Sequence, residues 1–409
     1  MHVLLLALNY WPDKLGNAPL MTGLAEGLAA RGHRVTVVCA FPHHEKGRIE
    51  DDYRGKLFDR STHNGVEIRR VWLYAPEGGA LAKMANYASF TLTALAAAVR
   101  VPDVDVVFTP SPPLTLGLVD QAISAFRRVP FVYNLQDLFP EAAVRLGVLT
   151  NPKAIRAFET LERHVYRKAH HLSIISDAFR GHLLERGVPD HKISYIPNYT
   201  DTDFITPLPS AGNRIRAAHG LDDMFVIQFS GRMGYSQGLE TVLEAWQQLD
   251  DLPDARLMMV GDGQAREMVD DALADDPRAV LLPTQARADL PHLLAAADVG
   301  LAPLRSGMAG TCIPSKMFGI MAAGRPVVAG LEAESDAGLM VRRAKSGLVV
   351  PPEDANALAA ALRQLYGDRD AARQMGASAR KYVETHHSQD VVVDQYESML
   401  RDVIARGRG

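Results

Sequence analysis

Glycine-rich segments that carry a cation are the first candidates for chemistry in this sequence. After the apolar run MFVIQFS comes GRMGYSQGLE, in which Gly231 and Gly234 allow close backbone approach and Gly238 opens a predicted helix. Backbone N–H groups at a helix start attract anionic oxygens, and Arg232 adds a planar cation suited to phosphate. The segment predicts an anion site; a surface turn with a solvated arginine is the alternative. It is not a Walker loop, because no G-K-[ST] follows.

A second cation follows the apolar run VGLAPL. In the segment RSGMAGTCIPSKMFGIMAAG, backbone N–H groups of Thr311, Cys312 and Ile313 come directly after Gly310. Lys316 falls in the first turn of the next predicted helix, where the helix dipole disfavours a cation. A neighbouring anion such as a diphosphate would explain a lysine at that place. The alternative is a lysine with a solvated head group.

Weaker candidates follow two other apolar runs of the second half. ARLMMV leads into GDGQAR, a generic strand-to-helix turn that contains Gly263. AVLLP leads into TQARADL, where backbone groups of Thr284 and Gln285 are candidates for contact with the polar edge of a base. A capped loop is an equally simple interpretation of this second segment.

The first half offers carboxylates rather than cations. NYWPDKLGNAP places Gly16 and Asn17 where a backbone contact with a ligand would be made. FVYNL leads into QDLFPEAAVRLG, which has Asp137 and Glu141 at the end of a predicted strand. Asp137 is a candidate for substrate contact or catalysis, or else belongs to the cap region of a helix. Glu141 is a candidate for substrate contact, or it simply complements the dipole of that helix.

Metal ligation and thiol chemistry are not predicted. The fourteen histidines form no HExxH motif or other paired spacing typical of zinc. Cys39 ends an apolar run and is predicted to pack in a core, and Cys312 has no recognisable base partner. Two cysteines are too few for a disulfide framework, which favours a reducing compartment. No GxGxxG follows the first strand.

The elements that must position these residues alternate between strands and helices. HVLLLAL, RVTVVCAF, VDVVFT and FVYNL predict buried parallel strands in the first half, and MFVIQFSG, ARLMMVGDG, AVLLPT, VGLAPL and PVVAG restart the pattern. The chain is therefore predicted to be α/β, with two doubly wound domains that face a central cleft. The predicted divisions are residues 1–205, residues 206–388 and a C-terminal helix, 389–409, that crosses back to the first domain.

Composition describes an ordinary globular protein of 409 residues, 47% hydrophobic and 22% charged. Residues 1–205 carry a net charge of +2 and the remainder −6, which does not suggest a nucleic-acid partner.

The N-terminus has no basic region before its short apolar run, so no signal peptide is predicted. Residues 84–99 carry no charge; a buried helix is favoured, and an amphiphilic patch resting on a bilayer is the alternative.

Taken together, these segments resemble the family-4 retaining glycosyltransferases of GT-B fold, which use sugar nucleotides. The likeness covers nearly the whole chain, including NYWPDKLGNAP, LAEGLAARGHRVTVV, DLFPEAAVRLG, FSGRMGYSQGLETVLEA, MMVGDGQARE and IPSKMFGIMAAGRPVVA. The DLFPE and GxxQGLE forms resemble most the subgroup that builds bacterial exopolysaccharide and O-antigen, the variable part of lipopolysaccharide. That subgroup includes fucosyl- and N-acetylfucosaminyl-transferases.

The resemblance implies two Rossmann-like domains, the second holding the nucleotide-sugar donor and the first the acceptor. It implies no bound metal and no cofactor, since the nucleotide-sugar is a substrate and basic side chains neutralise the leaving diphosphate. Arg232 matches the family's phosphate-binding arginine, and Lys316 lies in the subgroup's SK element. Asp137 would orient the acceptor or the sugar. Transfer would occur on one face of the sugar, without a covalent nucleophile.

Departures from the family pattern change the expected contacts. Gln237 stands where the common pattern has a lysine, and Thr311 and Gly319 stand where many relatives have two glutamates. Gln136 replaces a histidine often found before the aspartate. The second glutamate usually contacts the ribose, so in this chain the ribose is predicted to be held elsewhere or by backbone. Gln237 itself remains a candidate donor contact.

The leading hypothesis is a metal-independent glycosyltransferase that moves a hexose-type sugar from a UDP- or GDP-linked donor to a lipid-linked saccharide. It would act in the cytoplasm, with peripheral contact to the inner face of the membrane. An epimerase or phosphorylase-like enzyme of the same fold is one alternative. A non-catalytic protein that binds sugar nucleotides is another.

Overall fold

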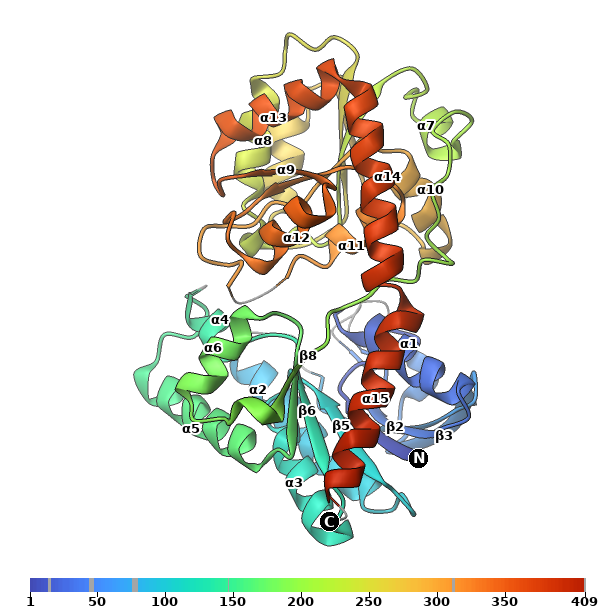
Figure 1. The fold of residues 1–409 in the computed structure, drawn as a ribbon, viewed down its shortest axis with the longest axis vertical. Coiled ribbons are helices and arrows are strands. Elements are labelled where there is room, and N and C mark those ends of the chain that lie inside the picture. Colours follow the sequence, from blue (N-terminus) through green and yellow to red (C-terminus); the bar gives the residue numbers. More distant parts are fainter. Residues whose placement is uncertain (14–15, 44–47, 76–79, 146, 311–312, 408–409) are drawn as a thin grey trace. The chain divides into compact units, whose positions relative to one another are not determined.

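The computed structural model describes residues 1–13, 16–43, 48–75, 80–145, 147–310 and 313–407 (Figure 1). The chain divides into two compact units. The first comprises Met1–Asn198 and Gln389–Gly409, and the second comprises Tyr199–Ser388. Residues 199–205, which the sequence pattern placed with the first domain, therefore belong to the second unit.

A largely parallel sheet forms the centre of the first unit, in the order β3-β4-β2-β1-β5-β6-β7-β8. Its strands are β1 (His2–Ala7), β2 (Arg34–Ala40), β3 (Phe58–His63), β4 (Val66–Val71), β5 (Val106–Pro110), β6 (Phe131–Leu135), β7 (His171–Ile174) and β8 (Ile193–Tyr195). β1, β2, β5 and β6 are apolar because helices cover both faces of the sheet. The predicted strands of this half are confirmed.

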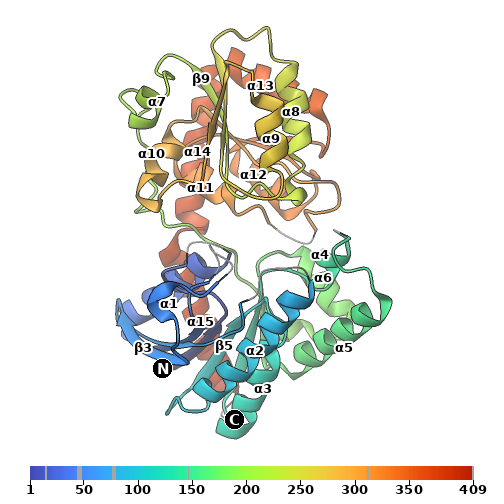
Figure 2. The ribbon, with the colours of Figure 1, turned by 180° about the vertical axis from the view of Figure 1, so that it is seen from behind.

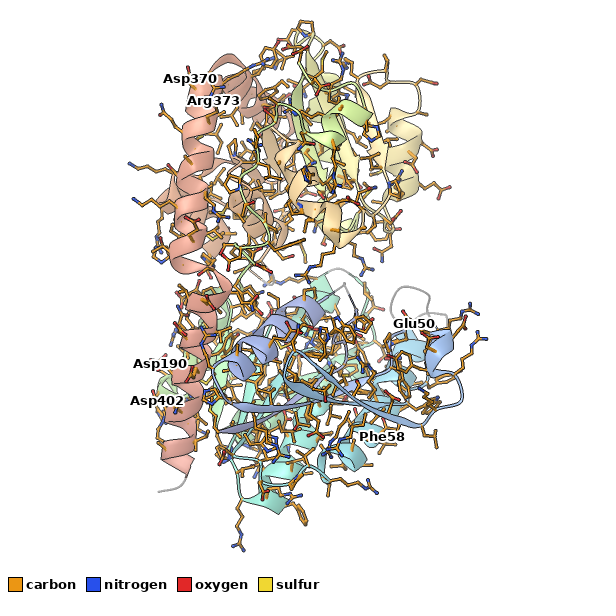
Figure 3. The ribbon with its side chains drawn as sticks, turned by 90° about the vertical axis from the view of Figure 1, so that its right-hand side faces the viewer. Glu50, Phe58, Asp190, Asp370, Arg373 and Asp402 are labelled. Atoms are coloured by element: carbon orange, nitrogen blue, oxygen red, sulfur yellow. The ribbon has the colours of Figure 1, made fainter. Side chains whose placement is uncertain are left out.

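The antiparallel pair of β3 and β4 was not predicted. The two strands are joined at Asn64 and Gly65, which have φ angles of 45° and 79°. An Asn-Gly pair supplies the two positive φ angles that a tight hairpin turn requires. β3 is an edge strand with no buried residue, and Phe58 at its start is 52% exposed (Figure 3).

Helices of the first unit pack on both faces of its sheet (Figures 1 and 2). They are α1 (Ala18–Ala30), η1 (Asp51–Tyr53), α2 (Ala80–Ala98), α3 (Leu116–Arg127), α4 (Glu141–Arg145), α5 (Pro152–Lys168), α6 (Ala178–Glu185), η2 (Asp190–Lys192) and α15 (Gln389–Gly407). α15 packs beside α1, where a Cβ on Gly27 would lie 2.9 Å from Val393. One apolar face of this helix is buried: Val392, Tyr396, Met399, Leu400 and Val403.

Only one face of α2 is buried. Phe90, Ala94 and Ala97 belong to the core, whereas Met84 and Leu92 are 48% and 70% exposed. The prediction of a buried helix at 84–99 is therefore wrong for its outer face. Among the described residues, no helix combines the length and the apolar character needed to cross a membrane.

The second unit contains a parallel sheet in the order β11-β10-β9-β12-β13-β14. The strands are β9 (Phe225–Ser230), β10 (Ala255–Val260), β11 (Ala279–Leu282), β12 (Val299–Leu301), β13 (Val327–Gly330) and β14 (Gly347–Val350). The helices are α7 (Arg214–Ala218), η3 (Tyr235–Gln237), α8 (Leu239–Gln247), α9 (Arg266–Leu273), η4 (Arg287–Asp289), α10 (Leu290–Ala295), α11 (Lys316–Ala322), α12 (Asp336–Ala344), α13 (Ala355–Gly367) and α14 (Arg369–His386). This strand order is that of a doubly wound nucleotide-binding sheet.

Candidate active site

The winding of the second sheet reverses between β9 and β12, which are hydrogen-bonded neighbours. In open α/β sheets, the crevice outside the carboxyl ends of two such strands is the usual ligand site. Gly231 and Arg232 follow β9 directly, and the segment from Pro303 to Gly310 follows β12. The glycine-rich segments predicted from the sequence thus lie at this reversal.

Lys316 reaches this place from α11. Its Nζ donates a hydrogen bond to Oε1 of Gln237 and lies 4.2 Å from the centre of the Phe229 ring. A Cβ added to Gly231 would lie 3.3 Å from Cε of Lys316, so the lysine passes directly beside that glycine. Three of the predicted residues, Gly231, Gln237 and Lys316, are therefore brought together at the end of β9.

Arg232 is the second cation at this edge. Its side chain is exposed, and within the described residues it makes no hydrogen bond or ion pair. Gly234 follows in the same loop, half-buried, and a Cβ there would lie 3.7 Å from Oε1 of Gln264. The guanidinium is thus available to an anion held beside Lys316.

Glutamate side chains bind part of the segment after β12. Arg305 donates to Oε1 of Glu240 at 2.6 Å and pairs with Glu353 at 3.4 Å. Oε1 of Glu332 accepts the backbone N–H of Gly307 at 2.6 Å, and its buried Oε2 has no hydrogen-bond partner in the described structure. Glu332, which was not predicted from the sequence, is therefore a carboxylate able to accept from a ligand hydroxyl.

The remaining residues of that segment differ in their surroundings. Gly310 is exposed, with open space where a Cβ would be. Ile313 is half-buried against the core around α11, in which Met317, Ile320 and Met321 are buried. Thr311 and Cys312 lie outside the described residues. At Gly319 a Cβ would lie 3.3 Å from Leu294, so a side chain there would start towards α10.

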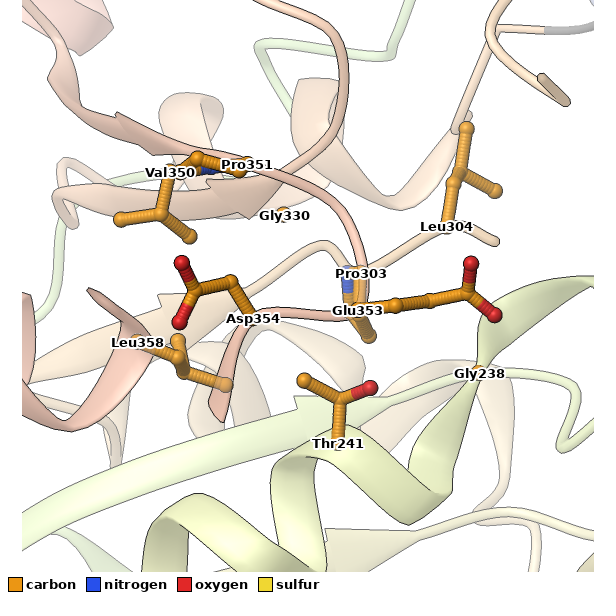
Figure 4. Close-up of a pocket in the computed structure, with 10 residues that line it drawn as sticks. All are labelled: Gly238, Thr241, Pro303, Leu304, Gly330, Val350, Pro351, Glu353, Asp354 and Leu358. Carbon is orange, nitrogen blue, oxygen red and sulfur yellow. The ribbon is translucent and has the colours of Figure 1, made fainter. Parts of the chain in front are cut away.

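A hollow lies at the ends of β12, β13 and β14, lined by Gly238, Thr241, Leu304 and two acids among others (Figure 4). Glu353 in its wall pairs with Arg305, and Oδ1 of Asp354 accepts the N–H of Ala357 at the start of α13. Carboxylates in the wall would repel a phosphate. This hollow is therefore distinct in chemistry from the two cations beside Gly231.

The loops after β10 and β11 are fastened to each other. Oδ2 of Asp262 accepts from the backbone N–H of Thr284 at 3.0 Å and from its hydroxyl at 2.8 Å. These two bonds lower the pKa of Asp262. Gln285 donates to the carbonyl of Pro283. The Thr284 N–H proposed for a base contact is thus already used, which leaves its carbonyl for that role.

Gly263 packs against backbone rather than open space. Its φ is 148°, and a Cβ there would lie 2.4 Å from the carbonyl oxygen of Met233. Met233 also donates its N–H to the carbonyl of Asp262 at 2.9 Å. The glycine therefore lets the loop after β10 pack directly against the loop that carries Arg232.

Substituting Gly263 by alanine is expected to destabilise the second unit by about 2–3 kcal/mol, through strained backbone and this contact. Gly220→Ala is the matched control, because Gly220 has φ of 65° but nothing within 4 Å of a Cβ. The control measures the cost of an ordinary left-handed φ without a steric contact, about 1 kcal/mol. Urea unfolding compares the two variants. Equal losses would mean that neither the contact with Met233 nor the φ of 148° adds to that cost.

In the first unit the winding reverses between β1 and β5, and the loops there are linked by polar groups. Asn17 donates to the carbonyl of Ser111 at 3.4 Å, and the Ser111 hydroxyl accepts the N–H of Gln136 at 3.0 Å. Gly16 has φ of 64°, and a Cβ there would lie 3.9 Å from Nδ2 of Asn9. The ends of β1, β5 and β6 therefore meet at one polar edge.

Asn9 and Gln136 are the buried polar groups of this edge. Oδ1 of Asn9 has no hydrogen-bond partner among the described residues. Gln136 donates to Oδ1 of Asn134 at 2.7 Å and accepts from Asn198 at 2.9 Å. Gln136, which replaces a histidine of the family pattern, is thus part of an amide network.

The two predicted carboxylates differ in environment. Asp137 is exposed at the end of β6. The pKa of Tyr87 in α2 is raised to about 12, chiefly by the burial of Tyr87 itself and in addition by the negative charge of Asp137. Glu141 is committed on both sides: Oε1 pairs with Arg145 at 2.5 Å and Oε2 with His182 at 2.8 Å. Asp137 therefore lies at the polar edge, whereas Glu141 belongs to an ion-pair cluster.

Cys39 is the cysteine that the structure describes. Cys39 is buried, and burial raises the pKa of its thiol to about 12. Within the described residues, no group of three or more His, Cys, Asp or Glu side chains is placed to share a metal ion.

Comparison with known proteins defines the class. Residues 16–199 match the model of the Glycosyl transferase 4-like domain, and residues 224–368 match that of Glycosyl transferases group 1. The chain therefore belongs to the glycosyltransferases built from these two domains, and its fold is GT-B. Sucrose-phosphate synthase from Thermosynechococcus elongatus shares that fold, with a TM-score of 0.76, 18% identity and 99% of each chain covered.

Two further proteins are informative in different ways. The putative colanic acid biosynthesis glycosyl transferase WcaI of Escherichia coli (strain K12) is 25% identical, covering 98% of this chain and 100% of that protein. Anabaena Alr3699/HepE, solved in complex with UDP, has a TM-score of 0.71 at 17% identity, covering 98% of this chain and all of that one. The first relates the sequence to polysaccharide biosynthesis, and the second relates the fold to a nucleotide complex.

Proposed function

We propose that this chain is a retaining glycosyltransferase that moves a sugar from a UDP- or GDP-linked donor to a lipid-linked saccharide in cell-surface polysaccharide synthesis. The observation that carries the proposal is the pair of cations at the end of β9. Lys316 lies beside Gly231, and the exposed Arg232 follows that glycine directly. Two cations at the strand reversal of a doubly wound sheet suit a diphosphate.

In the proposed reaction, the bond between the sugar's anomeric carbon and the diphosphate oxygen breaks. A bond to the acceptor oxygen forms on the same face of the sugar, and the acceptor proton passes to the leaving diphosphate. Negative charge develops on that diphosphate, and fixed cations lower the barrier by stabilising it. Lys316 and Arg232 would perform this role without a bound metal or cofactor.

Hydroxyl groups of the donor require acceptors. Oε2 of Glu332 is buried without a partner in the described structure, so it is the proposed contact for a donor hydroxyl. Such a contact would replace the carboxylate missing at Gly319. Thr284 and Gln285 remain proposed neighbours of the base.

The acceptor is assigned to the polar edge of the first unit. Asp137 would orient the acceptor hydroxyl, and Asn9 and Asn17 lie on the neighbouring loops. The acceptor class is supported by the Escherichia coli relative, whose name places it in colanic acid biosynthesis. A lipid-linked acceptor of that kind would be met in the cytoplasm, at the inner face of the membrane.

A thermal-shift panel tests the donor. UDP-, GDP- and dTDP-sugars, including GDP-fucose and UDP-N-acetylfucosamine, are compared at equal concentration, because a ligand of the native state raises Tm. A bound donor at 100 times its Kd is expected to stabilise the protein by about 2.7 kcal/mol. The HepE–UDP complex supports testing UDP-sugars first. No shift with any sugar nucleotide would contradict the proposal.

Product analysis separates the alternatives. A transferase releases nucleoside diphosphate in proportion to glycosylated acceptor. An epimerase would instead convert the donor without any acceptor, and a phosphorylase-like enzyme would require free phosphate. A protein that only binds sugar nucleotides would give the thermal shift and no product.

A further inference from the structure

An apolar stripe runs along the outer face of α2. Met84, Ala88, Leu92 and Ala96 recur at four-residue spacing and are all exposed. No charged residue occurs in residues 84–99. A helix that is apolar on its solvent side as well as on its core side has lost the pattern of an ordinary surface helix.

A second stripe lies on α3, next to the first. Its exposed residues are Leu118, Ala122, Ala125 and Phe126, of which Phe126 is 67% exposed. The two helices pack side by side (Figure 2), and the hydroxyls of Thr91 and Thr115 lie 2.8 Å apart between them. The two stripes therefore form one apolar surface.

A basic helix borders this surface. α5 packs against α3: His164 and Gln121 are 2.7 Å apart, and a Cβ on Gly117 would lie 2.4 Å from Val165. The exposed residues of α5 include Lys153, Arg156, Arg163, Arg167 and Lys168. The two acids of α5 are not exposed, since Glu162 is buried in an ion-pair cluster and Glu159 is half-buried.

Arginines also mark the carboxyl-terminal ends of the two apolar helices. Arg100 and Arg128 are exposed there, and Arg127 donates to the carbonyl of Val99. Asp103 is the nearest exposed acid in the sequence at that end. The combined surface, called here the α2–α3–α5 face, is thus apolar in the middle and basic on its border.

We infer that the α2–α3–α5 face binds the surface of an anionic lipid bilayer. Apolar side chains such as Leu92 and Phe126 would enter the interface between head groups and acyl chains, and the basic border would meet lipid phosphates. The inference rests on the proposed function for its biological sense. It adds to that function the face of the protein and the charge of the lipid.

Charge argues against a second copy of this chain as the occupant. Two such faces packed together would bring the arginines and lysines of α5 into a contact that offers few acids of its own. Like charges held close together oppose association. An anionic bilayer instead offers negative charge beside apolar volume, which matches both parts of the face.

Vesicle cosedimentation of the full chain tests the inference. Vesicles of phosphatidylcholine alone are compared with vesicles of equal parts phosphatidylcholine and phosphatidylglycerol. The Arg163→Gln/Arg167→Gln/Lys168→Gln variant is expected to bind the anionic vesicles about 100-fold more weakly. The Leu92→Ser/Phe126→Ser variant is expected to lose at least tenfold.

A matched variant removes the same charge elsewhere. Arg343→Gln/Lys345→Gln/Lys381→Gln also loses three exposed cations, all of them in the second unit. It is expected to bind as the wild type does. Equal weakening in this control, equal binding to neutral vesicles, or unchanged binding of both test variants would overturn the inference.

Donor binding is measured in parallel on the same variants. Tm shifts with sugar nucleotides should be unchanged in both, because the donor residues lie in the second unit. Vesicle binding without any donor shift would leave this inference standing while the proposed function failed. Donor shifts without vesicle binding would overturn this inference and leave the proposed function standing.

Discussion

Replacing Lys316 by alanine is expected to lower kcat for sugar transfer by about 100- to 1000-fold. The lysine is the cation best fixed at the end of β9, held by the side-chain oxygen Oε1 of Gln237 and by the Phe229 ring. A fixed donor that stabilises charge only as the diphosphate leaves acts on kcat more than on donor affinity. Initial rates at saturating donor, with nucleoside diphosphate release as the readout, measure the loss.

Lys381→Ala is the control, since Lys381 is an exposed lysine on α14 of the same unit. Its kcat should match that of the wild type. Unchanged kcat in Lys316→Ala would remove the lysine from the reaction. A rise in KM at constant kcat would make it a ground-state contact only.

Gln237 offers a sharper version of the same experiment. A lysine at this position would place a second ammonium against Lys316, so Gln237→Lys alone should be harmful. The double variant Gln237→Lys/Lys316→Gln returns one cation and one amide to the pair. Partial recovery of kcat would show that the charge matters more than the element that carries it; no recovery would show that the α11 position is required.

The sequence pattern was sufficient for the strand-end loops but not for the partners of individual side chains. Long apolar strands followed by glycines predict where parallel strands end, and that edge is where Gly231, Arg232 and Lys316 lie. The contact between Lys316 and Gln237 joins residues far apart in sequence, and no local signal encodes it. Glu332 was missed for the same reason, although its place just after β13 was a usable signal.

Glu141 illustrates the opposite difficulty. Its position at the start of a helix was consistent with substrate contact or with a dipole interaction. The structure adds two partners, Arg145 on the same helix and His182 on α6, which lies after β7 in the chain. The β3–β4 hairpin, by contrast, was predictable, because Asn64 and Gly65 are a strong turn signal between alternating residues.

Glu162→Gln is expected to destabilise the first unit by about 3 kcal/mol, the second large effect. Glu162 is fully buried; its Oε1 lies 2.8 Å from Nε2 of His182, and its Oε2 accepts from Arg186 at 2.6 Å. Removing the carboxylate charge leaves Arg186 without its anionic partner at the buried end. Urea unfolding, followed by a probe in the first unit, measures the loss, because two units need not unfold together.

Glu159→Gln is the matched control on the same helix. Glu159 is half-buried and has no ion-pair partner among the described residues, so its loss should stay within about 0.5 kcal/mol. Equal losses in the two variants would mean that the cluster contributes no more than a surface charge.

The pH dependence of this difference follows from the pKa of Glu162. Burial alone would raise that pKa, but hydrogen bonds from His182 and Arg186 outweigh it, so the net pKa is lowered. A lowered pKa means that the unfolded chain takes up the proton first as the pH falls. The stabilisation is therefore complete above about pH 4.3, the unfolded value, and is lost as the pH falls through the lower folded value. The difference in the free energy of unfolding between wild type and Glu162→Gln should accordingly narrow as the pH falls below about 4.3. A difference that did not narrow below that pH would contradict the assignment of a charged Glu162 to this cluster.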